Sequence, residues 1–540
     1  MKPRSRRGEW HCGEGVSQAE SLLWTSANPA CVTDLKTGLV QTDSLTPRNT
    51  IALSTLLSLG QGERFAMQAV HIPAQSMDRY IPVIGEEEVA VARTAAERAR
   101  KRLEGRVVWN VNSTAYGGGV VEILSTLLPY ARGAKIDARW LVIDGNVDFF
   151  RITKRLHHAL HGWDGDGSPL GDEQRRVYEG ALRDNASELS ALVRPRDIVL
   201  LHDPQTVGLA PELLRAGAVV IWRCHIGADE ANAQTDLGWD FLAPYLDRVP
   251  AFIFSRVQYI PDCCDHTRSV IIPPAIDPFS AKNQELDEDT VRAILVHAGI
   301  VEGPPGPGQP VFHRSDGSPE RVDRQADITR HGRAPAWETP LVVQVSRWDP
   351  LKDPLGVMDG FERLLDGKRL ASAHMVLAGP NVSAIADDPE GAETLDRVNE
   401  RWRCLPHGHR GRIHLACLPM ADSEENAAIV NALQRHAAVV VQKSLQEGFG
   451  LTVTEAMWKA RPVVGSAVGG IQEQIEDGAS GLLLQNPQDL TAFGALLERL
   501  LDDRAYGQTL GQAARERVRS QYLGLRQLIQ HAELLERIDA

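Results

Sequence analysis

The sequence predicts an α/β protein built from two doubly wound domains in tandem. Short apolar segments alternate with helical segments along most of the chain, and the short segments are apolar throughout rather than at every second position. Continuous apolarity is typical of parallel strands that are buried on both faces of a sheet. The alternation is interrupted by a stretch rich in Pro, Gly and charge between residues 303 and 340, and then resumes. Two sheets joined by that stretch account for this pattern.

The length and composition fit two globular domains with extensions. The chain has 540 residues, more than one hydrophobic core ordinarily supports. No apolar run approaches the roughly 18 residues that a membrane span needs. The first ten residues, MKPRSRRGEW, are basic but are not followed by an apolar core, so they do not match a secretory signal. We therefore expect a cytoplasmic protein without a membrane partner.

Charge and cysteine content argue against two other classes. The net charge is −13 and the chain has no basic stretch, which is unfavourable for nucleic-acid binding. The seven cysteines are scattered without a Cys-x-x-Cys pair, and Cys263 and Cys264 are adjacent. That spacing suits neither a zinc site nor an easy disulfide, so we expect reduced thiols.

The first domain is predicted over residues 84–302, after an N-terminal extension over residues 1–83 with little sustained periodicity. An amphipathic helix is expected over residues 85–102. The strands that follow have the sequences VVWNVN, RWLVIDG, DIVLLHDP, AVVIWRCHI, AFIFSR and SVIIPPAID. A helical run, VVEILSTLLPYAR, separates the first two of them.

The second domain is predicted over residues 341–540, after a linker or surface insertion over residues 303–340. Its strands have the sequences LVVQVSR, HMVLAGP, RIHLACLP, AVVVQKS and RPVVGSAVGG, and its last 36 residues before Asp539 read as helical. In open parallel sheets ligands bind beyond the carboxyl ends of the strands. The residues that follow each strand are therefore the candidates for chemistry.

A glycine-rich turn follows VVWNVN, the first strand of the first domain. It consists of Tyr116, Gly117, Gly118 and Gly119. Glycine lets backbone N–H groups approach a phosphate closely, and a helix N-terminus favours negative charge. The turn fits a phosphate cradle, and it equally fits a tight strand-to-helix connection with no ligand. It is not the G-x-G-x-x-G fingerprint, which argues against a nucleotide-dependent oxidoreductase.

Two cations follow the first strand of the second domain. Arg347 and Lys352 occur in the sequence SRWDPLK. A planar guanidinium and a mobile ammonium together suit a diphosphate. The ordinary alternative for such a pair is two solvated surface cations. The position directly after a strand favours the phosphate-binding role over that alternative.

Two glutamates bracket a Gly-Phe-Gly turn in EGFGLTVTE, between a predicted strand and a predicted helix. Thr452 and Glu455 match a capping box, with Thr as N-cap and Glu three residues later, so helix stability alone can explain Glu455. Glu447 has no such explanation. A carboxylate in a glycine loop at a helix N-terminus can accept hydrogen bonds from sugar hydroxyls, while the loop N–H groups, at Gly450, Leu451 and Thr452, can meet a phosphate.

The order of these motifs resembles the retaining glycosyltransferases of family four, which have the GT-B fold. The E-x7-E signature of that family is matched by Glu447 and Glu455. The match is closer to one branch, the trehalose-forming glycosyltransferring synthases and the trehalose phosphorylases. The matching stretches run in the branch's order from about residue 84 to 480: IGEEEV, VNSTAYGGGVVEIL, ARWLVIDGNVDFFRITKRLHHALHG, HDPQ, WRCHI, IIPPAIDP, QVSRWDPLKD and EGFGLTVTEAMWKARPVVGSAVGGI.

The resemblance implies roles for residues in the second domain, which would bind the nucleotide sugar. Glu447 would contact the hydroxyls of the donor sugar. Glu455 would bind the ribose of the nucleotide. Arg347 and Lys352 would bind the donor phosphates.

The resemblance also implies roles in the first domain, which would bind the acceptor. Gly118 and Gly119 match a loop that closes over the junction between sugar and phosphate. His225 matches a histidine near the reacting sugar. Asp203 lies at a strand end that faces the acceptor side.

The chain departs from the family pattern in three places. Residues 303–336 look like an insertion relative to the compact members, and the first 80 residues are additional. Asp353 stands where the family usually has Gly after the lysine. An acid beside a phosphate-binding lysine would weaken donor affinity, so the choice between a nucleotide and a sugar phosphate stays open.

Two further signals resemble metal sites but have simpler explanations. Asp164 and Asp166 form a D-x-D in a polar segment with no preceding strand, so we interpret them as part of a turn. His157, His158 and His161 end a predicted amphipathic helix without an evident third ligand for His157 and His161, so a solvated or packed helix face is expected.

Together these observations predict a retaining glucosyltransferase that transfers glucose from an NDP-glucose to glucose and forms α,α-trehalose. No metal is expected. The nearest alternative is a trehalose phosphorylase, which uses phosphate in place of the nucleotide. An alternative of another class is a protein that binds a sugar nucleotide without catalytic activity. The presence of Glu447, Arg347 and Lys352 together argues against that alternative. The expected partners are small-molecule substrates, and a homodimer is left open.

Overall fold

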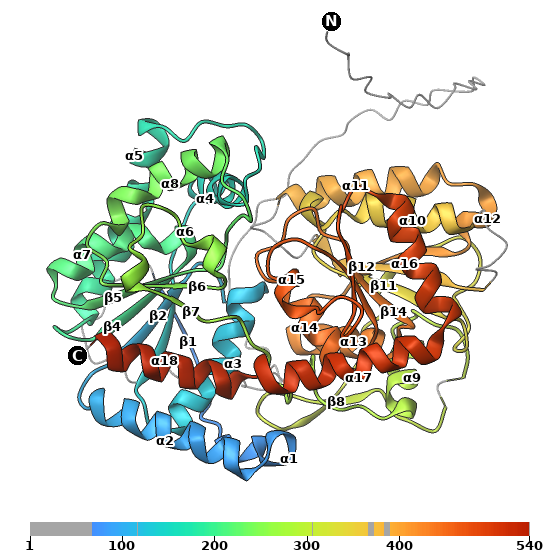
Figure 1. The fold of residues 1–540 in the computed structure, drawn as a ribbon, viewed down its shortest axis with the longest axis horizontal. Helices are drawn as coiled ribbons and strands as arrows, with labels where there is room; N and C mark the ends of the chain where they lie inside the picture. The colour runs from blue at the N-terminus through green and yellow to red at the C-terminus, as the bar shows by residue number, and fades with distance from the viewer. Residues whose placement is uncertain (1–66, 116, 305, 366–371, 383–388, 539–540) are drawn as a thin grey trace, which may run out of the picture. The chain divides into compact units, whose positions relative to one another are not determined.

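The computed structural model describes residues 67–115, 117–304, 306–365, 372–382 and 389–538. Most of the predicted N-terminal extension lies outside these ranges, as does Tyr116 of the glycine-rich turn. Within them the chain forms two seven-stranded sheets and a small two-stranded sheet (Figure 1). The prediction of two doubly wound α/β units is confirmed.

The first sheet has the strand order β1-β3-β2-β4-β5-β6-β7, with β1 antiparallel at one edge and the other strands parallel. Alternate residues of β4 enter different cores: Val199 and Leu201 pack on one face, and Ile198 and Leu200 pack on the other. Burial on both faces explains why the strand is apolar throughout. The strands are β1 (Gln68–Val70), β2 (Val108–Asn112), β3 (Ala138–Val142), β4 (Ile198–His202), β5 (Val219–Cys224), β6 (Ala251–Phe254) and β7 (Ser269–Ile271).

Helices cover both faces of the first sheet. The predicted helix over residues 85–102 is confirmed as α2, which buries its alanine-rich face. The helices of this half are α1 (Ile81–Ile84), α2 (Glu86–Arg102), α3 (Gly119–Gly133), α4 (Val147–Leu160), α5 (Asp172–Leu192), α6 (Asp203–Thr206), α7 (Ala210–Arg215) and α8 (Ala233–Leu246). The next helix, α9 (Glu288–His297), packs against α13 (Ser423–His436) of the second half. Short 3-10 helices are η1 (Met77–Tyr80), η2 (Val207–Leu209), η3 (Val257–Tyr259) and η4 (His266–Arg268).

The second sheet has the strand order β10-β13-β12-β11-β14-β15-β16, with β10 antiparallel at the edge and the other strands parallel. The strands are β10 (Asp327–Thr329), β11 (Leu341–Val345), β12 (His374–Pro380), β13 (Ile413–Leu418), β14 (Val439–Gln442), β15 (Val463–Ser466) and β16 (Leu482–Leu484). All five strands predicted for this half are present. The sequence analysis missed β16, a three-residue strand.

The helices of the second half end in a long C-terminal pair. They are η5 (Pro350–Lys352), α10 (Pro354–Leu365), α11 (Pro389–Arg403), α12 (His407–Arg410), α13 (Ser423–His436), α14 (Leu451–Trp458), α15 (Ile471–Gln474), α16 (Leu490–Asp502), α17 (Arg504–Gln521) and α18 (Gly524–Ile538). The last helix, α18, packs against α2 and α3 of the first half, and Figure 1 shows it in red beside them. The C-terminal end of the chain therefore contributes to the core of the first sheet.

The stretch over residues 303–340 contains regular structure that its composition did not suggest. The strands β8 (Val311–His313) and β9 (Pro319–Arg321) form an antiparallel hairpin, and β10 pairs with β13 of the second sheet. Phe312 and Val322 are buried, although charged and Pro residues surround them in the sequence. A few buried side chains in a polar stretch produce no periodic signal, so these strands could not be predicted from the pattern.

Two negative findings concern the described residues only. No helix in these ranges combines the length and apolarity that would let it cross a bilayer. The five cysteines in the described part of the chain, Cys224, Cys263, Cys264, Cys404 and Cys417, have free thiols.

Candidate active site

An ion pair between Glu447 and Lys352 lies at the ends of two adjacent strands. Lys352 Nζ lies 2.7 Å from Glu447 Oε1 and 2.6 Å from Oε2, and Ser444 Oγ donates a further hydrogen bond of 3.1 Å to Oε2. Lys352 follows β11 and Glu447 follows β14, and these two strands are parallel neighbours. Carboxyl ends of parallel neighbours meet at one edge of the sheet, which explains how residues 95 positions apart come together.

The predicted capping box at Thr452 and Glu455 is wrong. Helix α14 begins at Leu451, and its N-cap is Gly450, which adopts a left-handed conformation with φ of 86° and offers no side-chain cap. Thr452 therefore lies inside the first turn, where its hydroxyl donates to Oε1 of Gln442 at 2.9 Å. Because glycine tolerates positive φ, the helix starts two residues earlier than the capping motif suggested.

Glu455 is buried beside two residues that the sequence analysis did not single out. Its side chain is 1% exposed, and neither carboxylate oxygen accepts a hydrogen bond from a described donor. Lys282 Nζ lies 3.5 Å from it and also pairs with Glu122 on α3. Burial raises the pKa of Glu122 to about 7; Lys282 opposes this rise, and the carboxylate of Glu455 adds to it. Without its capping role, Glu455 is an acceptor that lacks a donor.

The family departure at Asp353 has a structural explanation. Its backbone is left-handed, with φ of 48°, a conformation that glycine adopts at little cost. Its carboxylate forms an ion pair with buried Lys443 and accepts a hydrogen bond of 3.0 Å from the N–H of Gly356 at the start of α10. The acid therefore neutralises Lys443, whereas Lys352 pairs with Glu447.

Arg347 lies among other charged groups beyond the end of β11. Burial alone would raise the pKa of Asp349, but Lys154, Lys352 and Arg347 outweigh it and hold that pKa at about 2. Lys154 comes from α4 of the first half, and its Nζ lies 3.6 Å from Asp349. The predicted cations therefore lie in a cluster of charged groups at this strand end, in which Lys154 also pairs with Glu390 at 3.4 Å and Lys352 pairs with Glu447.

Asp203 and His225 meet at the ends of β4 and β5 in the first sheet. Asp203 adopts a left-handed backbone with φ of 61°, and its Oδ1 accepts a hydrogen bond of 2.7 Å from the main-chain N–H of His225. Burial raises the pKa of Asp203 to about 7. Asp203 thus holds the backbone at His225.

The segment after β5 reaches the glutamate loop of the second half. A Cβ atom at Gly448 would lie only 2.7 Å from the carbonyl oxygen of His225, so the close approach requires glycine at this position. His161, just after α4, lies 2.9 Å from the carbonyl oxygen of Gly227 through Nδ1 and is buried. Its pKa falls to about 4, mainly through burial and then through Lys352. The packed alternative predicted for His161 is confirmed, and its ring also lies beside the glutamate loop, 3.7 Å from where a Cβ atom at Gly448 would be.

The glycine turn of the first half also approaches the glutamate loop. Gly118 is the N-cap of α3 with φ of 83°, and a Cβ atom at Gly119 would lie 3.7 Å from a methyl group of Leu451. The two predicted phosphate-binding turns are therefore neighbours. The D-x-D at Asp164 lies in a turn before α5, and no group of three or more His, Cys, Asp or Glu in the described ranges is arranged to hold a metal.

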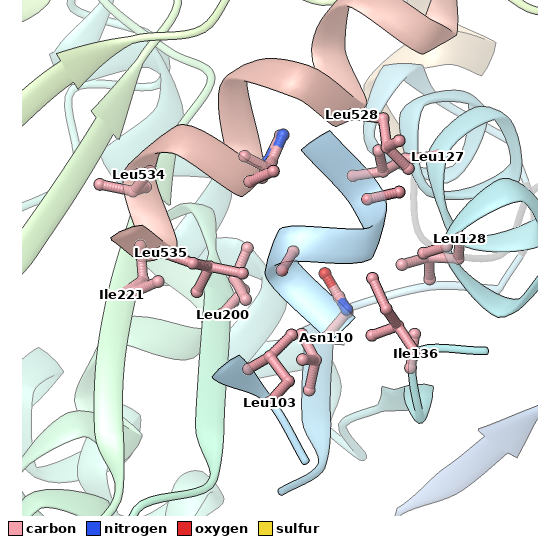
Figure 2. Close-up of a pocket in the computed structure, with 17 residues that line it drawn as sticks. Leu103, Asn110, Leu127, Leu128, Ile136, Leu200, Ile221, Leu528, Leu534 and Leu535 are labelled. Carbon is pink, nitrogen blue, oxygen red and sulfur yellow. The ribbon is translucent and has the colours of Figure 1, made fainter. Parts of the chain in front are cut away.

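An apolar cavity of about 60 Å³ lies apart from these polar groups. It is bounded by α2, α3, α18 and the first sheet, and Figure 2 shows its leucine side chains around Asn110. A sugar needs many polar partners, and this lining offers very few. The cavity is therefore not the candidate sugar site.

Comparison with known proteins agrees with this geometry. Residues 110–261 match the family described as trehalose synthase, N-terminal domain, and residues 329–517 match the family described as glycosyl transferases group 1. A trehalose synthase from Pyrococcus horikoshii is 33% identical over 467 residues, which cover 85% of this chain and 96% of that protein. This chain belongs to the trehalose synthase family.

A more distant relative and a solved structure are also similar to this trehalose synthase family member. A trehalose phosphorylase from Pleurotus pulmonarius is 24% identical over 454 residues, which cover 79% of this chain and 56% of that protein. The solved structure of a UDP-forming α,α-trehalose-phosphate synthase from Burkholderia xenovorans has a TM-score of 0.59 at 14% identity and covers 81% of this chain and 100% of that chain. The predicted GT-B fold is confirmed. As a trehalose synthase family member, the chain is a hexosyltransferase of trehalose metabolism.

Proposed function

We propose that this enzyme transfers glucose from an NDP-glucose to glucose with retention of configuration, forming α,α-trehalose or cleaving it in the reverse direction. The observation that carries the proposal is the ion pair of Glu447 and Lys352 at adjacent strand ends. A sugar linked to a diphosphate needs an acceptor for hydroxyl groups and a cation for phosphate oxygens at neighbouring positions. This ion pair supplies both.

The phosphate groups of the donor are assigned to the cations around Asp349 and to the start of α14. Lys352 and Arg347 supply positive charge, and the N–H groups of Leu451 and Thr452 lie in the first turn of that helix. A helix N-terminus and nearby cations stabilise an anion together. Binding of a phosphate would draw Lys352 partly away from Glu447, which frees carboxylate lone pairs for the hydroxyls of the donor sugar.

The ribose of the nucleotide is assigned to Glu455. A buried carboxylate without a hydrogen-bond donor is costly, and two ribose hydroxyls would supply the missing donors. A ligand without a ribose would leave Glu455 with the ammonium of Lys282 at 3.5 Å and without a hydrogen-bond donor. This favours a nucleotide over inorganic phosphate as the second substrate.

The proposed reaction proceeds on one face of the donor sugar. The bond between C1 and the phosphate oxygen breaks, a bond between C1 and an acceptor hydroxyl oxygen forms, and the hydroxyl proton passes to the leaving phosphate. Lys352 and Arg347 stabilise the charge that grows on the leaving group. The reaction as proposed uses no metal, so treatment with a chelator should leave the rate unchanged.

A trehalose phosphorylase is the second candidate, because relatives with that name also match the chain. The lengths favour the synthase: the match spans 96% of the Pyrococcus synthase but 56% of the Pleurotus phosphorylase. The carboxylate of Glu455, which accepts no hydrogen bond from a described residue, points the same way, since inorganic phosphate has no ribose.

The deciding experiment incubates the protein with trehalose and either inorganic phosphate or a panel of nucleoside diphosphates. We expect NDP-glucose from at least one diphosphate. Formation of glucose 1-phosphate from phosphate, with no product from any diphosphate, would replace the proposed donor. The absence of product under all conditions would contradict both candidates.

A further inference from the structure

Three polar side chains form a buried chain beneath the candidate site. His202, the last residue of β4, lies 3.4 Å from Asn110 Oδ1 through its Nε2 and 3.2 Å from Nε2 of His225 through its Nδ1. The two imidazole rings are nearly parallel, at 12°, with centroids 5.5 Å apart, which suits an edge-to-edge contact. Asn110 and His202 are 1% and 2% exposed, so water does not substitute for these contacts.

The series of hydrogen bonds through Asn110, His202 and His225 has a direction, because each contact has one donor and one acceptor. Asn110 Oδ1 can only accept, so Nε2 of His202 carries a hydrogen and donates it. In a neutral imidazole the other nitrogen is then an acceptor, so Nδ1 of His202 accepts from Nε2–H of His225. By the same rule Nδ1 of His225 is left without a hydrogen. The order of donors along the chain therefore assigns the tautomer of His225.

The surroundings keep both imidazoles neutral, as this assignment requires. Burial lowers the pKa of His202 and of His225 well below the ordinary value, and Arg223 lowers both further. The guanidinium of Arg223 lies between these rings and α18, where Nη1 is 3.1 Å from Nε2 of His531. Asp203 holds the backbone N–H of His225. Among the described residues, the hydrogen-bond partner of Nε2 of His225 is Nδ1 of His202.

Nδ1 of His225 is enclosed and has no hydrogen-bond partner in the described part of the chain. The loop that carries it approaches the glutamate loop, because the carbonyl oxygen of His225 contacts Gly448. A buried acceptor without a donor is incomplete until a ligand supplies one. A sugar hydroxyl is such a donor.

We propose that His202 is a positioning residue that fixes the tautomer of His225 and thereby presents Nδ1 of His225 as an acceptor for a hydroxyl of the bound sugar. The part of this inference that concerns the sugar hydroxyl rests on the proposed glucosyl transfer. The tautomer itself is independent of the donor and can be measured without substrate.

The test compares His202→Leu with His202→Asn. Leucine removes the acceptor for Nε2–H of His225, whereas the side-chain oxygen of asparagine takes a position close to that of Nδ1 in histidine. Nitrogen-15 spectra of histidine-labelled protein, assigned with His225→Gln, should show the Nε2–H tautomer at His225 in the wild type and in His202→Asn. His202→Leu should show a mixture of tautomers.

Kinetics then separate positioning from folding. His202→Leu should lower kcat/KM for glucosyl transfer about tenfold, which is the loss expected for one hydrogen bond. Its affinity for a free nucleoside diphosphate should not change, because that ligand has no transferred sugar. His202→Asn should recover most of the rate. The variants should melt as single transitions, which shows that they are folded.

The second sheet supplies a matched control, because His374 Nδ1 lies 3.0 Å from His414 Nε2. Breaking that contact with His374→Gln should change neither the tautomer of His225 nor kcat/KM. An Nδ1–H tautomer at His225 in the wild type would overturn the proposal, and so would full activity in His202→Leu or an equal loss in His202→Asn. Failure of the proposed function would appear differently, as wild-type protein that transfers no glucose while the tautomer assignment holds.

Discussion

Tyr259 donates its hydroxyl hydrogen to the main-chain carbonyl oxygens of Glu447, at 2.9 Å, and Gly448, at 2.8 Å. Tyr259 lies between β6 and β7 of the first sheet, and Glu447 follows β14 of the second. A residue of one half therefore holds the loop that carries the candidate sugar-binding carboxylate of the other. The ring is buried beneath the guanidinium of Arg256, which forms an ion pair with Asp229. The position of Glu447 therefore depends on both halves.

Tyr259→Phe should lower kcat for glucosyl transfer about fivefold, because one hydrogen bond of about 1 kcal/mol to the loop is lost while the ring is kept. Steady-state kinetics measure this effect. Tyr130→Phe removes a hydroxyl that lies 3.2 Å from Asp277 and serves as the control. Equal rates in wild type and Tyr259→Phe would show that the contact does not place Glu447.

Glu447→Gln should retain the fold and lower turnover about 10- to 100-fold, because an amide is a weaker acceptor for sugar hydroxyls and leaves Lys352 without its counter-charge. Turnover and melting temperature should be measured together. Glu476→Gln, whose side chain is 69% exposed, is the matched control. Near-normal turnover in Glu447→Gln would remove this carboxylate from the mechanism.

The double variant Arg347→Ala and Lys352→Ala should bind nucleoside diphosphates more weakly, by about 1.5–3 kcal/mol for each charged hydrogen bond lost. Calorimetric titration with UDP, ADP and GDP measures the change. Lys101→Ala on α2, where the lysine side chain is 70% exposed, should leave binding unaltered. If affinity does not fall in the double variant, the two cations do not bind the donor phosphates.

Asp353→Ala should destabilise the protein by about 3–5 kcal/mol, because it leaves the ammonium of Lys443 buried without a counter-charge. Adding Lys443→Met should recover much of the loss, since no buried charge then remains. Urea unfolding of the single and double variants measures both effects. A single variant as stable as the wild type would mean that Lys443 finds another partner or reaches water.

Asp203 should contribute stability that is lost as the pH rises from about 4 to 7. Burial raises the pKa of its carboxyl from 3.8 to about 7. Between these values the folded state holds a proton that the unfolded state has released, so this group adds a negative slope to the free energy of unfolding against pH, and the slope ends above pH 7. Asp203→Asn should reduce this slope in urea unfolding at several pH values, whereas exposed Asp184→Asn should not. An unchanged slope would contradict the assignment.

Local sequence patterns determined the two sheets and part of the site. Continuous apolar segments such as those that form β4 and β14 can only be buried on both faces, so the sequence alone predicts parallel, doubly wound sheets. Polar residues that follow parallel strands share one edge of the sheet, and the structure brings Lys352 and Glu447 together there. The motif order was sufficient to indicate the family.

The tertiary structure decided which atoms contact one another. The capping box at Thr452 matched a local motif, yet the left-handed backbone of Gly450 moved the helix start and left Glu455 without that role. The partner of Asp353 is Lys443, 90 residues away. Tyr259 and Lys282 reach the site from segments that no motif marked. Such contacts depend on the register of distant strands and on the conformations of the loops between them, and a local pattern of residues contains neither.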